Sequence, residues 1–226
     1  MQSAFSLDVE DMIEGGRYHN FHDFWKFPYP QQPGNLTYPD MPALSYPPFE
    51  NAGELAEVVR QADQLLHFPY QRYEYIIRFL QEAAADPAVR SIKMTLYRAA
   101  GRSAVFEALM QAARNGKEVL VFNEVQARFD EENNLSLGEQ LEEAGAKVLY
   151  SHEGLKVHSK LCLITRQTEN GLESQALLST GNFNEKTANV YSDLALFTGH
   201  PGITQEVKQV FDYLEHPEGT LTFNHL

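Results

Sequence analysis

The residues with the clearest chemical potential are His158 and Lys160, which lie two positions apart at the start of the apolar run 161–164. Alternate residues of a β-strand project from the same face, so this spacing predicts an imidazole and an ammonium side by side. An imidazole with a pKa of about 6.5 is largely neutral near physiological pH and can act as a nucleophile. The adjacent cation suits an anionic substrate. The pair indicates phosphoryl transfer through a phosphohistidine, or phosphate binding, with a packed or surface histidine as the alternative.

A second chemical feature follows about twenty residues later. Except for Phe183, residues 179–184 are small or carry side-chain amides, and the segment comes directly after the apolar run 176–178. A turn of this kind at the end of a strand exposes backbone N–H groups and Asn side chains that can hold phosphate oxygens. His-x-Lys followed at this distance by Gly-x-x-Asn resembles a half-site of the phospholipase D superfamily.

Six motifs sharpen this resemblance. They are 15–21 (GGRYHNF), 67–71 (HFPYQ), 95–98 (TLYR), 126–131 (QARFDE), 154–160 (GLKVHSK) and 180–188 (TGNFNEKTA). Together they resemble polyphosphate kinase of the phosphohistidine type, and they occur in that family's order along most of the chain.

The resemblance also implies a domain organisation. The family enzyme has an N-terminal helical domain that contacts the adenine, a head domain, and two phospholipase-D-like halves. We expect residues 1–50 to be the tail of the head domain and residues 51–226 to be the first phospholipase-D-like half. The chain is then expected to be a fragment. It would lack the second half, with another essential histidine and nucleotide-binding residues.

The implied activity is the reversible synthesis of inorganic polyphosphate from ATP, with His158 as the phosphorylated nucleophile. Lys160 would neutralise the oxygens of the transferring phosphoryl group. Asp193, at a predicted strand start, is the candidate acceptor for the other ring nitrogen of His158, with a plain turn residue as the alternative. Because half of the site is missing, the chain alone is expected to be inactive.

Further site residues follow from the same motifs. Tyr191 matches a tyrosine that the family assigns to ATP binding, although by itself it would be interpreted as a core aromatic residue. Asn182 and Asn184 are expected to shape the phosphate loop, with capping of a short helix over 185–188 as the alternative for Asn184. Lys186 is expected either to contact phosphate or to be solvated.

Two arginines complete the expected site. Arg98 and Arg128 each follow a predicted strand, where α/β sheets place their ligands. The resemblance implies a Mg²⁺ site at these positions. A guanidinium cannot bind a cation directly, so we expect both residues to belong to a metal–phosphate cluster rather than to ligate the metal. A solvated arginine is the alternative for each.

One departure from the phospholipase D pattern favours the kinase. Those enzymes carry an Asp a few residues after the lysine, whereas this chain has Ile164, Thr165 and Arg166 there. Two alternatives stay open: a single-motif phosphodiesterase that is active as a homodimer, and a non-catalytic module that binds polyanions. The expected partners are ATP or ADP, polyphosphate and the remaining domains of a longer chain, with the full-length enzyme a homo-oligomer.

Composition limits other functions. The formal net charge of −13 argues against nucleic acid as a partner. A locally basic cleft is compatible with this negative net charge, because five of the 12 Lys and Arg residues after position 90 lie in the motifs above. The single Cys162 excludes an internal disulfide and fits a reducing compartment. No segment resembles a transmembrane helix or a signal peptide, so we expect a cytoplasmic protein, or one peripheral to the membrane in a longer parent enzyme.

The remaining pattern predicts the fold class. Seven of the 11 prolines lie between residues 28 and 48, interleaved with aromatic residues, which indicates an irregular segment. After it, predicted helices alternate with predicted strands. This alternation is typical of an α/β sandwich around a mixed sheet. The predicted helices cover 52–63, 70–85, 103–114, 135–144 and 203–214, and the predicted strands cover 91–96, 118–122, 146–150, 158–165, 174–178 and 193–197. The short loop 167–171 suits a hairpin, so strands 158–165 and 174–178 are expected to be antiparallel neighbours.

Overall fold

The computed structural model describes residues 5–12, 15, 38–39, 41–97, 103–124, 131–151 and 157–226. The chain divides into two units, Met1–Met41 and Pro42–Leu226. In the described part of the first unit, the regular element is the short helix η2 (Val9–Asp11). The second unit contains all the strands described below. The prediction that residues 1–50 form the tail of a preceding domain stays a prediction, because most of them lie outside the described residues.

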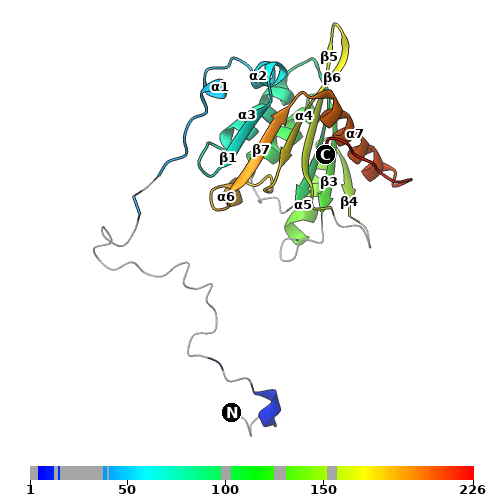
Figure 1. Ribbon diagram of the computed structural model, residues 1–226. Coiled ribbons are helices and arrows are strands. Elements are labelled where there is room, and N and C mark those ends of the chain that lie inside the picture. The colour runs from blue at the N-terminus through cyan, green and yellow to red at the C-terminus, as the bar shows by residue number, and fades with distance from the viewer. Residues whose placement is uncertain are drawn as a thin grey trace. The chain divides into compact units, whose positions relative to one another are not determined.

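The described strands of the second unit form one mixed sheet in the order β1-β7-β6-β5-β2-β3-β4 (Figure 1). Strands β2, β3 and β4 are parallel, whereas β1, β7, β6, β5 and β2 are joined by antiparallel pairs. The sheet confirms the predicted fold class. The strand bounds are β1 (Gln64–Phe68), β2 (Val89–Tyr97), β3 (Glu118–Glu124), β4 (Lys147–Tyr150), β5 (Lys160–Thr168), β6 (Gly171–Ser179) and β7 (Asp193–Thr198).

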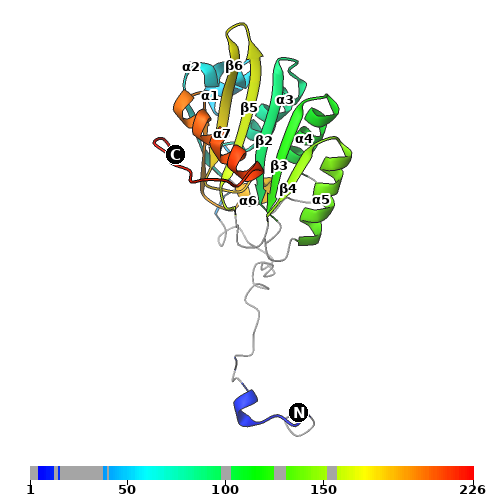
Figure 2. The ribbon, with the colours of Figure 1, turned by 90° about the vertical axis from the view of Figure 1, so that its right-hand side faces the viewer.

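Helices cover both faces of this sheet (Figure 2). One face packs against α2 (Leu55–Gln61), α3 (Glu74–Ala85), α4 (Ala104–Arg114) and α5 (Glu131–Glu143), which share a large apolar core with it. The opposite face packs against α7 (Pro201–Glu215) through a smaller core. The short helices are α1 (Pro47–Glu50) and α6 (Glu185–Ala188). None of the helices in the described ranges has the length and apolar content needed to cross a membrane.

Local sequence explains why these elements form. In α3, the buried residues Tyr75, Ile76, Phe79, Leu80, Ala83 and Ala84 recur at helical spacing and turn one face to the core. Helix α7 begins with Pro201, whose fixed φ suits the first helical position. The central strand β5 is buried on both faces from Lys160 to Ile164, which accounts for its continuous apolar run.

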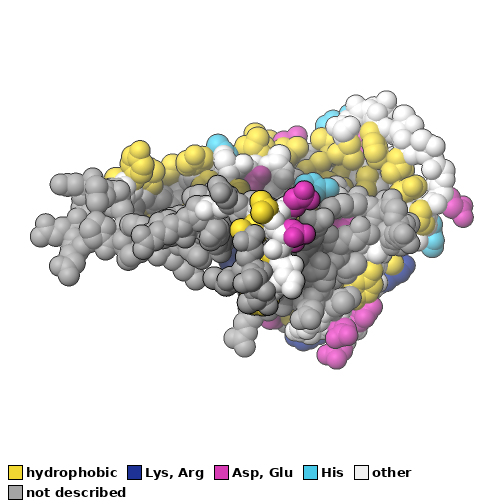
Figure 3. Space-filling model, turned by 90° about the horizontal axis from the view of Figure 1, so that it is seen from below, with side chains coloured by type: hydrophobic (Ala, Val, Ile, Leu, Met, Phe, Trp, Pro, Cys, Tyr) yellow, Lys and Arg dark blue, Asp and Glu magenta, His cyan; other side chains and the backbone are white. Residues whose placement is uncertain are grey.

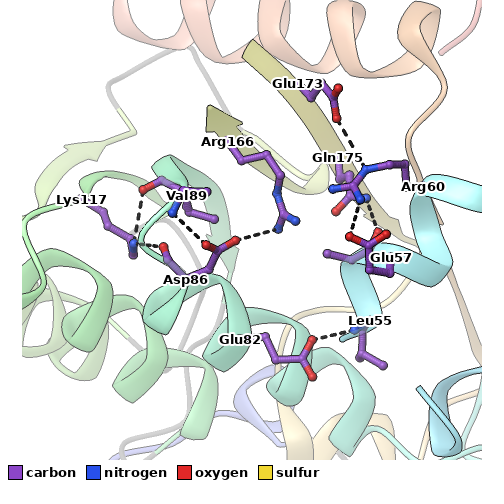
Figure 4. Close-up of polar contacts among 12 residues, drawn as sticks. Leu55, Glu57, Arg60, Glu82, Asp86, Val89, Lys117, Arg166, Glu173 and Gln175 are labelled. Atoms are coloured by element: carbon purple, nitrogen blue, oxygen red, sulfur yellow. Dashed lines mark hydrogen bonds and ion pairs between the residues drawn. The ribbon is translucent and has the colours of Figure 1, made fainter. Parts of the chain in front are cut away.

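Polar contacts join the helical layer to the sheet (Figure 4). They lie toward the hairpin end of β5, away from His158. The buried Arg166 of β5 lies 3.7 Å from Asp86 after α3, and the Nε2 of Gln175 in β6 donates to the carbonyl of Ala56 at 2.7 Å. A pocket of about 430 Å³ lies at this end. Its two arginines, Arg60 and Arg166, pair with carboxylates. These contacts hold α2 and α3 on the sheet that positions the candidate site.

The structure corrects the predicted start of the central strand. The predicted strand began at His158, but β5 begins at Lys160, so His158 precedes the strand rather than sharing its face. The hydroxyl of Thr95 explains why the regular pairing of β2 with β5 does not extend to His158. It donates to the carbonyl of Ser159 at 2.8 Å and accepts from the N–H of Leu161 at 2.9 Å, so a side chain of β2 bonds the backbone where the ladder with β5 stops.

Two further differences concern neighbouring elements. Strand β1 was not predicted: its five residues alternate between buried and exposed positions, but they are too few for a clear period. The predicted antiparallel pairing of β5 with β6 is confirmed, with Lys160 opposite Ser179 and Thr168 opposite Gly171. The hairpin turn is shorter than expected, because both strands extend almost to it.

Candidate active site

The candidate site lies where β5 starts, β6 ends and β7 starts, which is one end of the sheet because these strands alternate in direction. Figure 3 looks onto this end, where histidine, acidic and hydrophobic side chains of the described residues lie close together. The site is a pocket of about 450 Å³. Its lining residues are Tyr97, His158, Lys160, Thr180, Gly181, Asn182, Thr187, Tyr191, Ser192 and Asp193.

His158 and Lys160 are in direct contact in this pocket. The Nζ atom of Lys160 lies 2.9 Å from Nδ1 and 3.2 Å from Nε2 of His158, and it donates to the backbone carbonyl of His158. The imidazole itself is exposed, and it packs edge-on against Tyr97 with 5.1 Å between ring centroids. The predicted juxtaposition of imidazole and ammonium is therefore present, although His158 precedes the strand.

Burial sets the electrostatics of Lys160. Only 6% of its surface is exposed, and this desolvation lowers the pKa of its ammonium, while the nearby carboxylate of Asp193 acts in the opposite direction. The ring of Tyr97 lies 5.5 Å from Nζ and provides a further favourable contact for the cation. A buried lysine of this kind offers a concentrated positive charge to an anion that enters the pocket.

Asp193 is packed tightly against the glycine of the loop. The hydroxyl of Thr180 donates to its Oδ1 at 2.8 Å. A Cβ atom on Gly181 would lie 2.2 Å from Oδ2 of Asp193, so the position requires glycine. Asp193 thus lies in the pocket beside Lys160 and is oriented by Thr180. Its expected role as the acceptor for the ring of His158 stays a prediction.

The loop residues separate into pocket-lining and structural positions. Asn182 lines the pocket, and its buried Oδ1 has no hydrogen-bond partner among the described residues. Asn184 is buried and caps α6, because its Oδ1 accepts from the N–H groups of Lys186 and Thr187 at 3.0 and 3.2 Å. The capping alternative for Asn184 is therefore confirmed. Tyr191 lines the pocket and is 62% exposed, so it is not the core aromatic that its sequence alone would suggest.

Of the remaining expected residues, only Lys186 lies within the described ranges, and it is not brought into the pocket. The side chain of Lys186 is exposed and is not among the pocket-lining residues. Arg98 and Arg128 lie outside the described residues, so their expected place in a metal–phosphate cluster stays a prediction. Tyr97, which directly precedes Arg98, does line the pocket.

Glu124 is a positioning residue that the sequence reasoning missed. It ends β3 and is only 1% exposed. Its Oε1 accepts from the hydroxyl of Ser151 at 2.6 Å and its Oε2 accepts from the N–H of Val157 at 2.9 Å. The carboxylate therefore holds both ends of the segment that leads to His158. The sequence held little signal, because Glu124 follows Asn123 beyond the apolar run 119–122. Only the packing shows that its carboxylate is buried and hydrogen-bonded, as a buried carboxylate must be.

Glu185 is a second missed positioning residue. Its carboxylate accepts from the hydroxyl of Ser103 at 2.9 and 3.0 Å and from the N–H of Ala104 at 2.7 Å. It thus caps α4 from a distant part of the sequence, where a negative charge also suits the helix dipole. The contact joins the start of α6, directly after the loop 179–184, to the start of α4. This cap could not be predicted from the sequence around α4, because the capping side chain belongs to another element.

One protein-family model matches most of this chain. The model of polyphosphate kinase C-terminal domain 1 matches residues 54–220. The chain belongs to the polyphosphate kinase family. The family resemblance carried by the six motifs is thereby confirmed.

Individual members of the polyphosphate kinase family show how much of an enzyme this chain represents. The polyphosphate kinase of Yersinia pestis is 42% identical over 217 residues, which are 96% of this chain and 31% of that enzyme. That of Escherichia coli K12 is 42% identical over 219 residues, which are 96% of this chain and 32% of that enzyme. The chain spans about a third of the length of these curated relatives.

Solved structures extend the comparison to the fold. The crystal structure of polyphosphate kinase from Porphyromonas gingivalis matches 94% of this chain and 35% of its own, with 43% identity and a TM-score of 0.78. Nuc from Salmonella typhimurium, a phospholipase D family member, matches 72% of this chain and 99% of its own, with 13% identity and a TM-score of 0.51. The second likeness concerns the fold alone and confirms the expected phospholipase-D-like sandwich.

Proposed function

We propose that this chain supplies one half of the active site of an ATP–polyphosphate phosphotransferase, with His158 as the residue that is phosphorylated. The observation that carries the proposal is the exposed imidazole of His158 in contact with the buried ammonium of Lys160, inside a pocket of about 450 Å³. An imidazole in this position can approach a phosphorus atom while the cation attracts the phosphoryl oxygens.

The proposed reaction has two steps. A ring nitrogen of neutral His158 attacks the γ-phosphorus of ATP in line, an N–P bond forms, and the bond to the β,γ-bridging oxygen breaks as ADP leaves. A terminal oxygen of polyphosphate then attacks the phosphohistidine, which lengthens the polymer and restores the imidazole. With ADP as the acceptor the sequence runs backward. Lys160 neutralises the phosphoryl oxygens in both steps, and Asp193 is proposed to orient the ring of His158.

The nucleotide contacts are proposed from the pocket lining. Tyr191 and Asn182 lie at the pocket wall and would contact ATP, whereas Asn184 and Lys186 would act through the shape of the loop. Mg²⁺ is expected to accompany ATP. No group of three or more His, Cys, Asp or Glu side chains in the described ranges could hold a metal ion. Arg98 and Arg128, to which the magnesium site is assigned, lie outside the described residues, so that site stays a proposal and no step is routed through the metal.

The proposed setting follows from the family and from the length of the chain. ATP or ADP and polyphosphate are the proposed substrates, and the parts of the relatives that this chain does not match are the proposed partners within a homo-oligomeric cytoplasmic enzyme. The chain by itself is expected to make no polyphosphate, because those parts complete the site. Purified wild-type chain that turned over ATP steadily into polyphosphate would contradict the half-site proposal.

A hybrid enzyme tests the proposed function. This chain would replace the matching third of the Escherichia coli polyphosphate kinase, and polyphosphate synthesis from ATP would be measured. The proposal expects synthesis by the folded hybrid and none by its His158→Ala variant. A folded hybrid without synthesis, or synthesis that survives the substitution, would contradict it. Phosphodiesterase activity of the chain as a homodimer, or polyanion binding that does not depend on His158 and Lys160, would favour the two alternative functions.

A further inference from the structure

The segment 67–71 (HFPYQ) is one of the six family motifs, and none of its residues lines the candidate pocket. It closes a turn at the end of β1. The N–H of His67 donates to Oε1 of Gln71 at 2.7 Å, and the N–H of Gln71 donates to the carbonyl of His67 at 2.9 Å. The imidazole of His67 packs edge-on against Tyr70, with 4.8 Å between ring centroids. The turn therefore holds the ring of His67 in a defined place.

That place is beside the candidate active site. Strand β1 pairs with β7 so that His67 lies opposite Leu194 and Phe68 lies opposite Asp193. The pairing brings Nε2 of His67 to 2.8 Å from the hydroxyl of Ser192, although 125 positions separate the two residues. Ser192 in turn lines the pocket that contains Lys160. The hydroxyl thus lies between the His67 turn and the pocket.

The chemistry of a hydroxyl gives this contact a direction. A serine hydroxyl can accept a hydrogen bond and donate one at the same time. When Nε2–H of His67 donates to Oγ of Ser192, the hydroxyl proton is left to point toward another acceptor. In a pocket with a buried lysine, that acceptor is an anionic oxygen of the ligand, and a donor bonded to an anion forms a strong hydrogen bond.

We propose that Ser192 binds a phosphoryl oxygen of the substrate and that His67 is a positioning residue that makes the Ser192 hydroxyl a donor. This inference rests on the proposed function, because it takes the pocket to be a phosphate site. Both residues are exposed. A polyanion can therefore reach the hydroxyl without displacing a core residue, and substitutions here leave the apolar core intact.

Matched substitutions separate the donor role of His67 from its packing. His67→Gln keeps an N–H group near the position of Nε2, whereas His67→Asn places its amide near Nδ1, too short to reach Ser192. Ser192→Ala removes the hydroxyl itself. Ser174→Ala is the control, because that hydroxyl bonds Thr165 at 2.9 Å and belongs to the far half of the β5–β6 hairpin.

The experiment is a calorimetric titration of the purified chain with inorganic tripolyphosphate at constant ionic strength, with circular dichroism to verify folding. Loss of one hydrogen bond to an anion at an exposed site weakens binding by about tenfold. We expect this loss for Ser192→Ala and for His67→Asn, and near wild-type binding for His67→Gln and Ser174→Ala.

The outcomes distinguish this inference from the proposed function. Binding that is unchanged in Ser192→Ala overturns the inference and leaves the phosphate pocket in place. An equal loss in His67→Gln and His67→Asn overturns the positioning role of His67. A wild-type chain that does not bind tripolyphosphate contradicts the inference directly, whereas synthesis by the hybrid enzyme would still uphold the proposed function.

Discussion

The ammonium of Lys160 lies within 3.2 Å of both ring nitrogens of His158. A neutral imidazole carries a lone pair on one of its two nitrogens, and Nζ lies close enough to donate to it. In the proposed reaction the same lone pair attacks phosphorus. An incoming phosphoryl group therefore has to draw Nζ from the ring to its own oxygens, which links ligand binding to release of the nucleophile.

Replacing His158 tests this relationship most directly. In the hybrid enzyme, His158→Ala is expected to abolish the acid-labile, base-stable phosphate label that ATP deposits, because the nucleophile is gone. Labelling with radioactive ATP, followed by acid and alkali treatment, measures this. His216→Ala, an exposed histidine at the end of α7, is the control and should label like wild type. Labelling at the wild-type rate in His158→Ala would identify another histidine as the nucleophile.

Lys160→Ala should slow the label without removing it. The nucleophile remains, but one charged contact to the transferring phosphoryl group is lost. Removal of one such stabiliser typically costs roughly 2–4 kcal/mol, or on the order of 10²–10³ in rate. Rapid-mixing measurements of label formation in the hybrid enzyme give the rate. A wild-type rate in Lys160→Ala would exclude a role for this cation in the transition state.

The buried environment of Lys160 predicts a pH dependence. Burial lowers the pKa of this ammonium below its usual value of 10.5. As the pH rises through the lowered value the positive charge is lost, so tripolyphosphate binding should weaken at a lower pH than for a solvated lysine. Titrations at increasing alkaline pH measure this. In Lys160→Arg the guanidinium stays charged, so the alkaline loss should disappear; an identical loss in both proteins would assign it to another group.

Glu185 should contribute to stability through its cap on α4. Glu185→Ala leaves the N–H of Ala104 and the hydroxyl of Ser103 without their acceptor and should lower the free energy of unfolding by about 1–2 kcal/mol. Urea denaturation measures the change. Glu57→Ala is the matched control, because its exposed ion pair with Arg60 is expected to contribute less than about 1 kcal/mol. Equal losses in the free energy of unfolding would show that the cap stabilises the protein no more than an exposed ion pair does.

The thiol of Cys162 should not react with alkylating reagents in the native protein. It is fully buried in β5, and burial raises the pKa of its thiol to about 12, so almost no thiolate is present or accessible. Native chain should resist iodoacetamide, whereas chain unfolded in urea should be alkylated. Mass spectrometry reads out both reactions. Rapid modification of the folded chain would show that β5 opens far more readily than its packing implies.

Local pattern was sufficient for much of this protein. The alternation of helices and strands, the antiparallel pairing of β5 with β6 and the cap by Asn184 were all predictable, because each depends on residues close together in the chain. The proximity of His158 and Lys160 was also predictable from their spacing. The resemblance of the motifs to the family assigns this pair to a phosphate site, and that assignment stays a prediction.

Tertiary structure alone decided the relationships that cross the chain. The burial of Lys160, the two bonds by which Glu124 holds the segment before His158, and the cap that Glu185 places on α4 depend on which elements pack together. The contact between His67 and Ser192 depends on β1 pairing with β7 at the edge of the sheet. Hydrophobic periodicity specifies which face of an element is buried. It does not specify which partner covers that face, because that choice is settled by the packing of the whole sheet.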